Sequence, residues 1–523
     1  MQISYNITML IVNQIKLKLN EKESLLKHKL IEKLHLKADE LIDYSIHQKS
    51  IDARKEFYFV YSLKVKLKNE NKHINKKDVI KYEEYDYTCP IINTDIRPII
   101  VGYGPSGIFA AIRLCEAGLK PIIFEKGSRI NQRAIDVENF FNHGILNPES
   151  NVQFGEGGAG TFSDAKLTTR NKHPFIKYIL DKFIEYGADE AIAYENHPHI
   201  GTDEIRKIIT RITDDLIAKG ASFHFDEAVE DFIIEDRKVK AVITKNDTYY
   251  SDYVILAMGH SAYNLFKVLN KYGVALENKD FSVGFRVEHP QAMIDLNQYK
   301  ENYGHVALKA AEYFLTAKTS VNKGVYSFCM CPGGYVVPSS ADEKTIVTNG
   351  MSYAARNNHL ANSAILVQIS KEDYGEGLFA GFDYIHKLEH QAYDISNSYQ
   401  ALSQNIKDYL NNDLNPLIFK SSYSLGTKLY NFNEFFDPKL NQAFYEAIMH
   451  FDKIIPGFIE NGIMVGPETK SSCPIRINRN DTYESTNTKG LYPCGEGAGY
   501  AGGIVSSALD GLRIANQLIA ILG

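Results

Sequence analysis

Two glycine-rich segments, far apart in the chain, restrict what this sequence can fold into. Residues 97–107 read Arg-Pro-Ile-Ile-Val-Gly-Tyr-Gly-Pro-Ser-Gly, and residues 490–503 read Gly-Leu-Tyr-Pro-Cys-Gly-Glu-Gly-Ala-Gly-Tyr-Ala-Gly-Gly. The apolar run Pro98–Val101 is short and rich in isoleucine, which is typical of a buried parallel strand. The G-x-G-x-x-G pattern after it predicts a strand–turn–helix unit that binds a dinucleotide.

Each glycine of the first segment has a predicted role. Gly102 permits the tight turn, Gly104 lets the backbone approach a pyrophosphate, and Gly107 lets the following helix pack on the strand. That helix, over 108–117, ends at Gly118 and presents free N–H groups and a positive dipole end to phosphates.

A second strand, over 120–124, leads to Glu125, which is placed to accept hydrogen bonds from ribose hydroxyls. A carboxylate there repels a 2′-phosphate, which excludes NADP from this turn. The late segment is of the kind that closes over the other end of the same cofactor, so the pair favours FAD over NAD. The alternative is an ordinary glycine-rich turn in some other α/β protein.

Bulk properties exclude several classes of protein. A chain of 523 residues exceeds one compact core, and a net charge of −6 argues against nucleic acid as the main partner. Residues 1–20 lack the pattern of a secretory signal, and no membrane span is expected. Six cysteines do not form a disulfide framework, so we expect a cytoplasmic protein with reduced thiols. The oligomeric state is not predicted.

The fold class predicted is α/β, with three domains: a small N-terminal α+β domain (1–95), a discontinuous FAD-binding domain (96–260 and 463–523) and an inserted substrate domain (261–462). In the first domain the patterns predict strands over 11–19 and 57–67, a helix over 21–36 and a linker over 71–95. The FAD-binding domain is expected to have a helix over 204–219, a β-meander over 222–256 and a terminal strand and helix within 491–522. The inserted domain reads as mixed strands up to residue 348 and mostly helices from there to residue 459.

This order of motifs resembles flavoproteins with the glutathione-reductase type of FAD domain, over about 97–260 and 463–523. A closer resemblance covers nearly the whole chain. Phe154-Gly-Glu-Gly-Gly-Ala-Gly-Thr-Phe-Ser-Asp164, His199-Ile-Gly-Thr-Asp203, Ser327-Phe-Cys-Met-Cys-Pro-Gly-Gly334 and Asn349-Gly-Met-Ser-Tyr-Ala-Ala-Arg356 are similar to the signatures of bacterial FAD-dependent dehydrogenases, a family of unassigned substrate. The resemblance implies that Val229 contacts the adenine, that the Ala257–Gly259 strand end passes the cofactor, that Glu496 touches the ribitol and pyrophosphate region, and that 498–504 runs beneath the flavin.

The residues and the family resemblance together predict one cofactor site, and they argue against a nicotinamide site and a redox-active C-x-x-x-x-C pair. We find no second dinucleotide turn for a nicotinamide and no C-x-x-x-x-C pair after the first turn, so a disulfide reductase of the glutathione type is not expected. Arg129 or Arg133 is a candidate for a phosphate contact, or for a solvated helix face. The predicted cofactor-binding residues are Gly102, Gly104, Pro105, Ser106, Gly107, Glu125, Lys126, Arg133, Gly158, Gly160, Thr161, Val229, Met258, Gly259, Gly495, Glu496, Gly502, Gly503 and Ile504.

The candidate catalytic residues are Asp164, Cys331 and Arg356. Alternation along a strand would put Cys329 and Cys331 on one face, as core thiols or as a pocket lining with a redox-active thiol. Metal binding is not expected, because two ligands in C-x-C need two more. Asp164 and Lys166 are candidates to orient a substrate or to hold the N5 edge of the flavin, or else to form an exposed ion pair in a loop folded on itself. Arg356 and Asn362 are candidates to clamp a substrate carboxylate, with a structural ion pair of the arginine as the alternative. His197 and His199 are candidate general bases or structural residues.

The predicted activity is hydride transfer between an unidentified small-molecule substrate and flavin N5, by an FAD-dependent oxidoreductase. One alternative is a flavin monooxygenase or an ene-type reductase that uses transient NAD(P)H. Another, of a different class, is a flavin-binding redox sensor whose N-terminal domain docks a partner.

Overall fold

The structure, a computed structural model, describes residues 8–523 except 38 and 55, so residues 1–7 of the predicted N-terminal domain lie outside it. The described chain forms two compact units. The first comprises the chain up to Cys89 with Arg170–His199 and Asn302–Lys309, and the second comprises Pro90–Thr169, Ile200–Glu301 and Ala310–Gly523. Two segments that the sequence analysis assigned elsewhere thus belong to the first unit.

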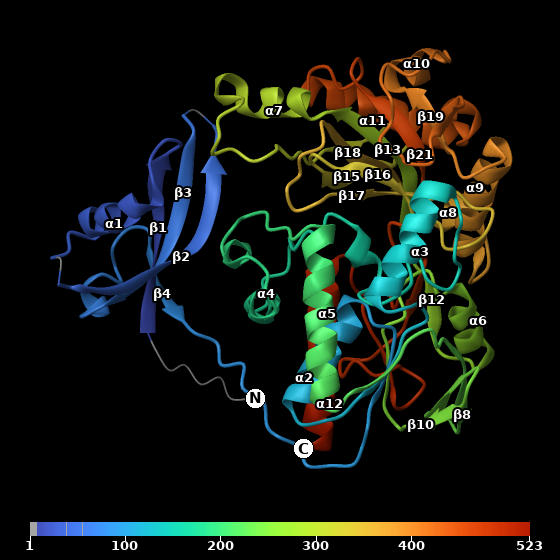
Figure 1. Cartoon of the computed structure of the whole chain (residues 1–523), viewed down its shortest axis with the longest axis horizontal. Helices are drawn as coiled ribbons and strands as arrows, with labels where there is room; N and C mark the ends of the chain where they lie inside the picture. Colours follow the sequence, from blue (N-terminus) through green and yellow to red (C-terminus); the bar gives the residue numbers. More distant parts are fainter. Residues whose placement is uncertain (1–7, 38, 55) are drawn as a thin grey trace. The chain divides into compact units, whose positions relative to one another are not determined.

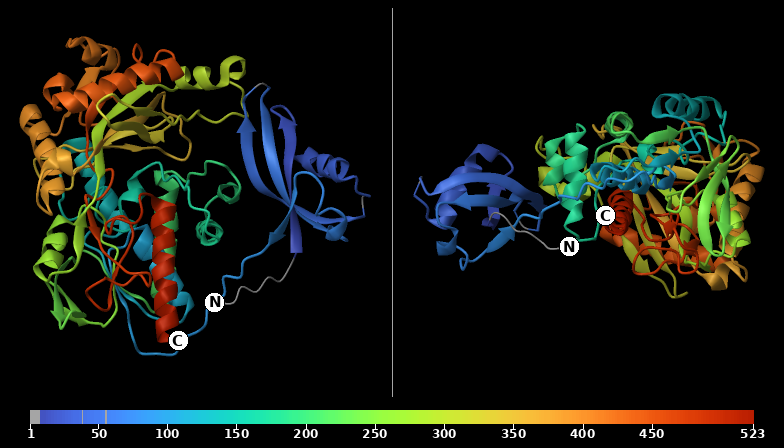
Figure 2. Two further views of the ribbon diagram at one scale, coloured as in Figure 1. Left: turned by 180° about the vertical axis from the view of Figure 1, so that it is seen from behind. Right: turned by 90° about the horizontal axis from the view of Figure 1, so that it is seen from below.

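The first unit is built on an antiparallel sheet of order β2-β3-β1-β4, and α1 packs on one face of it (Figures 1 and 2). Alternating leucines and valines of β1 and β3 form its core because successive side chains point to opposite faces. The predicted linker 71–95 was wrong in part, since it contains β4, and β2 was not predicted. The bounds are β1 (Thr8–Lys18), α1 (Leu26–Leu34), β2 (Leu41–Asp52), β3 (Tyr58–Leu67), β4 (Val79–Glu83) and, in the same unit, α4 (Phe175–Glu185).

The second unit contains a five-stranded parallel sheet of order β23-β11-β5-β6-β7, which confirms the predicted α/β class. Helices α2 and α12 pack along one another, with α5 against α2 (Figure 1). The bounds are β5 (Ile99–Val101), α2 (Pro105–Glu116), β6 (Ile122–Phe124), α3 (Ile130–His143), α5 (Thr202–Ala218), β7 (Ser222–His224), β11 (Val254–Leu256), β23 (Leu491–Pro493) and α12 (Ile504–Leu522).

The predicted meander is present as a three-stranded antiparallel sheet of order β10-β9-β8. Its strands are β8 (Val229–Glu235), β9 (Lys238–Thr244) and β10 (Thr248–Tyr250). Asp236 and Arg237, both at positive φ, make the turn between β8 and β9.

A seven-stranded sheet of order β14-β15-β18-β13-β21-β19-β20 forms the other part of the second unit. Helices account for most of the regular structure between residue 348 and residue 459, as predicted, but β18 was not expected there and is a central, almost wholly buried strand. The sheet strands are β13 (Phe281–Pro290), β14 (Thr316–Lys318), β15 (Gly324–Cys331), β18 (Leu360–Ile369), β19 (Ala401–Asn405), β20 (Thr427–Leu429) and β21 (Ile463–Glu468). Smaller pairs are β12 (Leu276–Asn278) with β22 (Ile475–Ile477), and β16 (Tyr335–Pro338) with β17 (Thr348–Met351).

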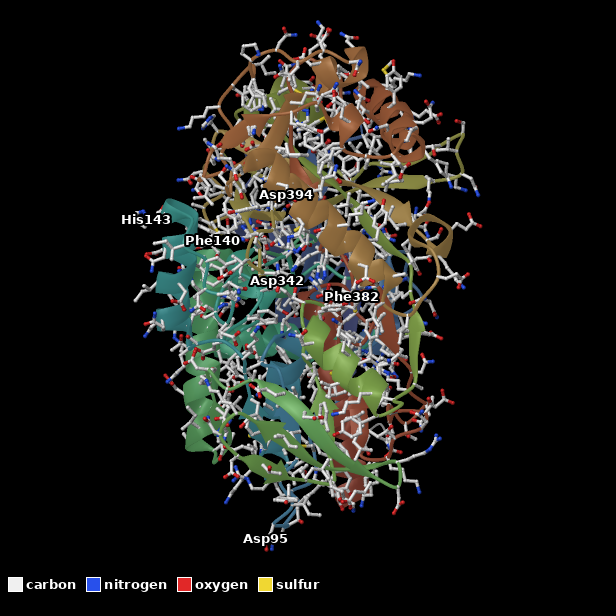
Figure 3. The ribbon with its side chains drawn as sticks, turned by 90° about the vertical axis from the view of Figure 1, so that its right-hand side faces the viewer. Asp95, Phe140, His143, Asp342, Phe382 and Asp394 are labelled. Atoms are coloured by element: carbon white, nitrogen blue, oxygen red, sulfur yellow. The ribbon has the colours of Figure 1, made fainter. Side chains whose placement is uncertain are left out.

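Helices surround this second sheet and join it to the dinucleotide part. Phe382 on α9, which is labelled in Figure 3, packs at a tilt against Tyr263 and Phe266 on α6, with ring centroids 5.0 and 5.3 Å away. The helices are α6 (Tyr263–Lys271), α7 (Gln291–Tyr299), α8 (Lys371–Tyr374), α9 (Ala380–Ser396), α10 (Ile406–Asn411) and α11 (Pro438–Ile454).

Among the described residues, α12 is the one helix long and apolar enough to cross a membrane. Most of its apolar window, 61%, is buried inside the protein, chiefly against α2. That burial is what a core helix of a folded domain shows.

Candidate functional site

The turn after β5 has the geometry that its glycines predict. Gly102 lies at φ +96°, and a Cβ there would stand 2.4 Å from the carbonyl oxygen of Ala257. A Cβ on Gly107 would stand 2.1 Å from the carbonyl oxygen of Gly102. Both positions therefore require glycine, one for the turn and one for the packing of α2 on the strand.

Gly104 differs, because its missing side chain leaves space. It is the N-cap of α2, without a side-chain cap, and the nearest atom to an added Cβ is the Gly158 Cα at 3.7 Å. Bare backbone at a helix N-terminus, with free N–H groups and the positive end of the dipole, fits a pyrophosphate.

Three separate segments meet at this turn. Gly158 lies against Gly104, a Cβ on Gly160 would stand 3.0 Å from Ile504 at the start of α12, and a Cβ on Gly495 would stand 2.6 Å from the hydroxyl of Ser106. The structure thus brings together the dinucleotide turn, the 157–160 loop and the late glycine segment, as the sequence predicts.

The end of β11 adds a buried polar group without a partner. Gly259, at φ +72°, has no atom within 4 Å of an added Cβ. The Nδ1 atom of His260 is 2.9 Å from Glu496 Oε1, whereas its Nε2 atom is buried and has no hydrogen-bond partner in the described chain. A buried ring nitrogen without a hydrogen-bond partner, beside open glycine backbone, fits a polar ligand at this strand end. His260 was not predicted.

Glu125 is engaged differently from the expectation. Its carboxylate is buried and accepts hydrogen bonds from the backbone N–H groups of Tyr103, Gly127 and Gly155, at 2.9, 3.0 and 2.8 Å. In this structure it therefore ties the turn after β5 to the loop before Gly157. The ribose contact remains a prediction.

Arg133 also differs from the expectation of a phosphate contact. The side chain is wholly buried, and its guanidinium donates to the carbonyl oxygens of Asn151, Val152, Gly155 and Glu156. Because the guanidinium N–H groups bond to these four carbonyl oxygens, Arg133 holds the glycine-rich loop in its conformation.

The other predicted cofactor residues come from several elements. Pro105 is the first residue of α2, Thr161 is buried, and Val229 begins β8. Lys126 lies over the ring of Phe154, with Nζ 4.2 Å from its centroid. Met258, Gly502 and Gly503 occupy the end of β11 and the approach to α12, where Gly502 has open space around an added Cβ. The predicted contacts of all these residues with the cofactor stay predictions.

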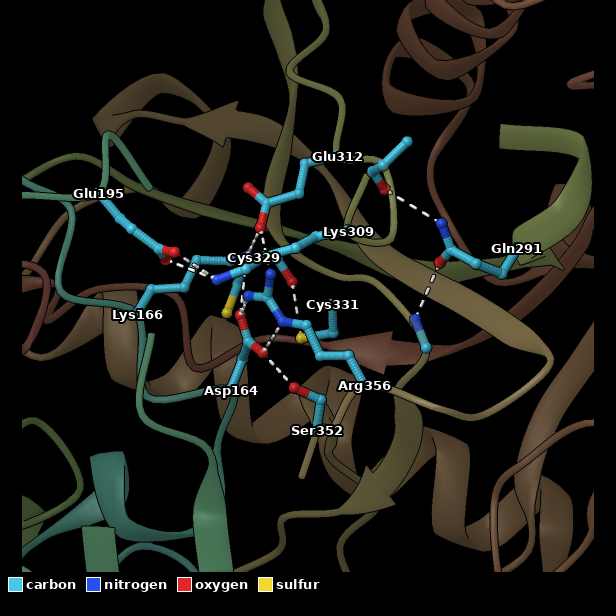
Figure 4. Close-up of polar contacts among 12 residues, drawn as sticks. Asp164, Lys166, Glu195, Gln291, Lys309, Glu312, Cys329, Cys331, Ser352 and Arg356 are labelled. Atoms are coloured by element: carbon cyan, nitrogen blue, oxygen red, sulfur yellow. Dashed lines mark hydrogen bonds and ion pairs between the residues drawn. The ribbon is translucent and has the colours of Figure 1, made fainter. Parts of the chain in front are cut away.

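The predicted catalytic residues Asp164 and Arg356 are in direct contact (Figure 4). Arg356 donates to both carboxylate oxygens of Asp164, with Nε 3.1 Å from Oδ1, and Ser352 donates to the same carboxylate. Lys166 Nζ lies 2.7 Å from Asp164 Oδ2. Asp164 is therefore a completely buried anion with two cationic partners.

Glu312 completes this group of side chains, which we call the Asp164 cluster: Asp164, Lys166, Glu312, Ser352 and Arg356. Its carboxylate lies 2.6 Å from Arg356 Nη1 and 3.3 Å from Lys166 Nζ. Burial alone would raise the pKa of Asp164, but Lys166 and Arg356 outweigh it and lower that pKa to about 2. Burial opposes the charge of Lys166 and Arg356 as well, yet the two carboxylates raise both pKa values. The cluster is fully ionised and electrically balanced.

The two thiols lie beside this cluster, and Figure 4 shows them next to Lys166 and Arg356. Cys331 is buried, whereas Cys329 is partly exposed. The Sγ atom of Cys331 lies 3.2 Å from the carbonyl oxygen of Cys329. Arg286, wholly buried, donates to that same carbonyl and pairs with Glu468. The regular strand expected for the pair is interrupted by a bulge.

Several functional candidates were not recognised from the sequence. Glu312 lies in an irregular segment and Arg286 in a buried strand, and neither belongs to a motif. Asn362, predicted to act with Arg356, instead accepts a hydrogen bond from Arg286 at 2.7 Å. His197 and His199 belong to the first unit, whereas the Asp164 cluster belongs to the second.

One group of potential metal ligands exists among the described residues, formed by Asp342, His386 and Glu389 (Asp342 is labelled in Figure 3). The buried ammonium of Lys470 lies 3.8 Å from Asp342 and already supplies positive charge there. The group lies outside the Asp164 cluster.

Comparison with known proteins supports FAD as the cofactor. Residues 280–471 match a family described as "FAD-dependent protein, C-terminal domain-like", and residues 9–68 match a domain of unknown function, DUF8436. Among solved structures, a glycine oxidase from Bacillus cereus is 13% identical (82% of this chain, 96% of that chain, TM-score 0.31), and the halogenase PltM in complex with FAD is 12% identical (82% and 70%, TM-score 0.39). TM-scores this low support no conclusion about this chain.

A whole-chain relative is found in Clostridium beijerinckii. It is an uncharacterized protein, 38% identical over 522 residues, which are 97% of this chain and 98% of that protein. Full-length similarity at this identity, with the FAD-dependent C-terminal domain and a turn whose glycines fit a dinucleotide, leads to one conclusion. The chain belongs to the same family as the Clostridium beijerinckii protein, and its cofactor is FAD.

Proposed function

We propose that the chain is an FAD-dependent oxidoreductase that transfers a hydride between a small-molecule substrate and N5 of the flavin. FAD supplies the redox chemistry when bound. The Asp164 cluster carries the proposal, because it is a buried, charged group of side chains, and two of its members, Asp164 and Lys166, closely follow Gly158, which contacts the dinucleotide turn.

Exposure separates the roles within the cluster. Asp164 and Arg356 are 0% and 7% exposed, so they hold their neighbours in place. Lys166 and Glu312 are 21% and 24% exposed, so they can reach a substrate. The raised pKa of Lys166 keeps it protonated, and its ammonium can donate a hydrogen bond or a proton to a substrate oxygen.

Glycines and the buried Arg133 give the site its other property, a loop with little side-chain bulk. Gly155, Gly157 and Gly158 all lie at positive φ, and Arg133 fastens the loop through its carbonyl oxygens. Such backbone lets a flat ligand approach closely and keeps water from that face.

Anaerobic mixing of the purified holoenzyme with NADH or NADPH tests the direction of electron flow, with flavin absorbance as the readout. A dehydrogenase whose own substrate is the donor should not bleach with either nucleotide, yet should bleach with dithionite. Fast bleaching by a nucleotide would instead support the reductase or monooxygenase alternative. A protein that dithionite cannot bleach would overturn the proposal.

A further inference from the structure

The backbone around the two thiols departs from a regular strand. In a flat strand, residues i and i+2 are separated by about twice 3.3 Å, too far for the Cβ separation of about 3.5–4.5 Å that a disulfide needs. Here Cys329 has φ +44°, and the register between β15 and β18 shifts between Phe328 and Cys331. The bulge and the left-handed residue break the regular alternation at the two cysteines, and the Cys331 thiol donates to the carbonyl oxygen of Cys329, with Sγ 3.2 Å from that oxygen.

Charge makes the two thiols unequal. The hydrogen bond from Cys331, with Arg286 and Lys166 nearby, lowers the pKa of Cys329 to about 7, although burial opposes this. The hydrogen bond to Cys329 and burial raise the pKa of Cys331. Cys329, a partly exposed thiolate, therefore has the properties of an attacking cysteine, and Cys331, a buried thiol, has those of a resolving cysteine.

Other cysteines of the chain provide a contrast. Burial raises the pKa of Cys115 and of Cys473 to about 12, and that of Cys494 as well. Thiols whose pKa is raised in this way are poor nucleophiles. Of Cys115, Cys329, Cys331, Cys473 and Cys494, Cys329 is the one whose thiolate the surroundings favour.

The thiol pair is linked to the cofactor loop through the Asp164 cluster. Lys166 stabilises the Cys329 thiolate and pairs with Asp164. Asp164 in turn follows the Gly158–Gly160 loop that lies against Gly104 and Ile504. Lys166 and Asp164 therefore connect the thiol pair to the loop that shapes the cofactor site.

We propose that Cys329 and Cys331 form a dithiol–disulfide couple that exchanges two electrons with the FAD of the same chain. In the oxidising direction the sulfur of Cys329 bonds to that of Cys331, the Cys331 thiol loses its proton, and the electron pair goes to the oxidised flavin. The reverse step breaks the S–S bond with two electrons from the reduced flavin and returns a proton to Cys331. This inference rests on the proposed flavin function.

A reductive titration counts the electrons. Air-oxidised holoenzyme titrated anaerobically with dithionite should take up about four electrons per flavin, two for the flavin and two for the disulfide. Cys329→Ser and Cys331→Ser should each take up about two, while Cys115→Ser, a variant of a cysteine outside the pair, should keep four. Two electrons in the unaltered protein would overturn the inference while leaving the flavin function intact, whereas a flavin that accepts none would refute the proposed function instead.

Mass spectrometry gives a readout that does not depend on activity. Trypsin should release residues 324–344, between Lys323 and Lys344, a peptide whose only cysteines are Cys329 and Cys331. After alkylation without reduction, the oxidised holoenzyme should yield this peptide unalkylated and lighter by two hydrogens. After anaerobic reduction of the flavin it should become doubly alkylated. Double alkylation in the oxidised protein would show that no disulfide forms.

Discussion

Arg356 and Asp164 lie 192 residues apart in the chain, and the arginine donates to both oxygens of the buried carboxylate. A two-point pair of this kind fixes the guanidinium plane as well as its distance. Because Asp164 is completely buried, neither partner can be removed without leaving an uncompensated charge. The pair therefore fastens the cofactor loop to the segment that ends at Arg356.

Asp164→Asn should destabilise the protein strongly. The amide keeps the shape but leaves Arg356 and Lys166 without their shared anion, and breaking a buried pair in this way costs about 3–5 kcal/mol. Urea unfolding measures the loss. Glu204→Gln, which breaks the exposed pair with Lys207, should cost about 0–1 kcal/mol. Equal small losses for both variants would show that the Asp164 pairs contribute little.

Acid should weaken the protein through the same residue. The pKa of Asp164 in the folded protein, about 2, lies below its ordinary value of about 4. Its contribution is thus fully present above about pH 4 and is lost as the pH falls toward 2, because the unfolded chain binds the proton more readily. Unfolding free energy measured from pH 5 to 2 should fall less in Asp164→Asn than in the unaltered protein. Parallel curves would contradict this.

Gly104→Ala should lose FAD without losing the fold. An added Cβ meets only the Gly158 Cα at 3.7 Å in the protein, but it occupies the space that a pyrophosphate needs. The ratio of flavin to protein absorbance should drop to near zero, more completely still in Gly104→Val. Gly324→Ala is a matched control, since its Cβ also has room, 3.9 Å from Gln368. A fully yellow Gly104→Val protein would refute the assignment of the turn.

Arg133→Met should loosen the glycine-rich loop. The variant leaves four buried carbonyl oxygens without their donor, at about 1–3 kcal/mol for each group left unsatisfied. Limited proteolysis should then cut within 151–160, and FAD should bind more weakly. Gln132→Met, on the exposed face of the same helix, where the side chain donates to Asp136, should resist cleavage as the unaltered protein does. Identical digestion of both variants would refute the scaffold role.

A chain that begins at Pro90 should keep its flavin. The cofactor turn, the Asp164 cluster and the thiol pair all belong to the second unit, while the removed sheet has a core of its own. Flavin content and dithionite bleaching should match those of the full chain. A colourless but folded truncated protein would show that the first unit supports cofactor binding.

Sequence patterns predicted those turns, strands and helices whose formation depends mainly on neighbouring residues in the chain. The glycines of the turn after β5, the parallel strands around it and the terminal helix were confirmed, because turn geometry and apolar runs are written in consecutive residues. β4 and β18 were missed, since their strand character depends on pairing with β1, β13 and β15.

By itself the sequence determined the α/β class, the dinucleotide turn and the choice of Asp164, Cys331 and Arg356 as candidates. Only the tertiary structure decided that Asp164 and Arg356 form one ion pair, that Asn362 pairs with Arg286 instead, and that Glu312 completes the cluster. The tertiary structure also showed that the side chains of Glu125 and Arg133 form hydrogen bonds with backbone groups of the glycine-rich loop. Such contacts join distant segments, and their charges depend on burial, which no run of neighbouring residues specifies.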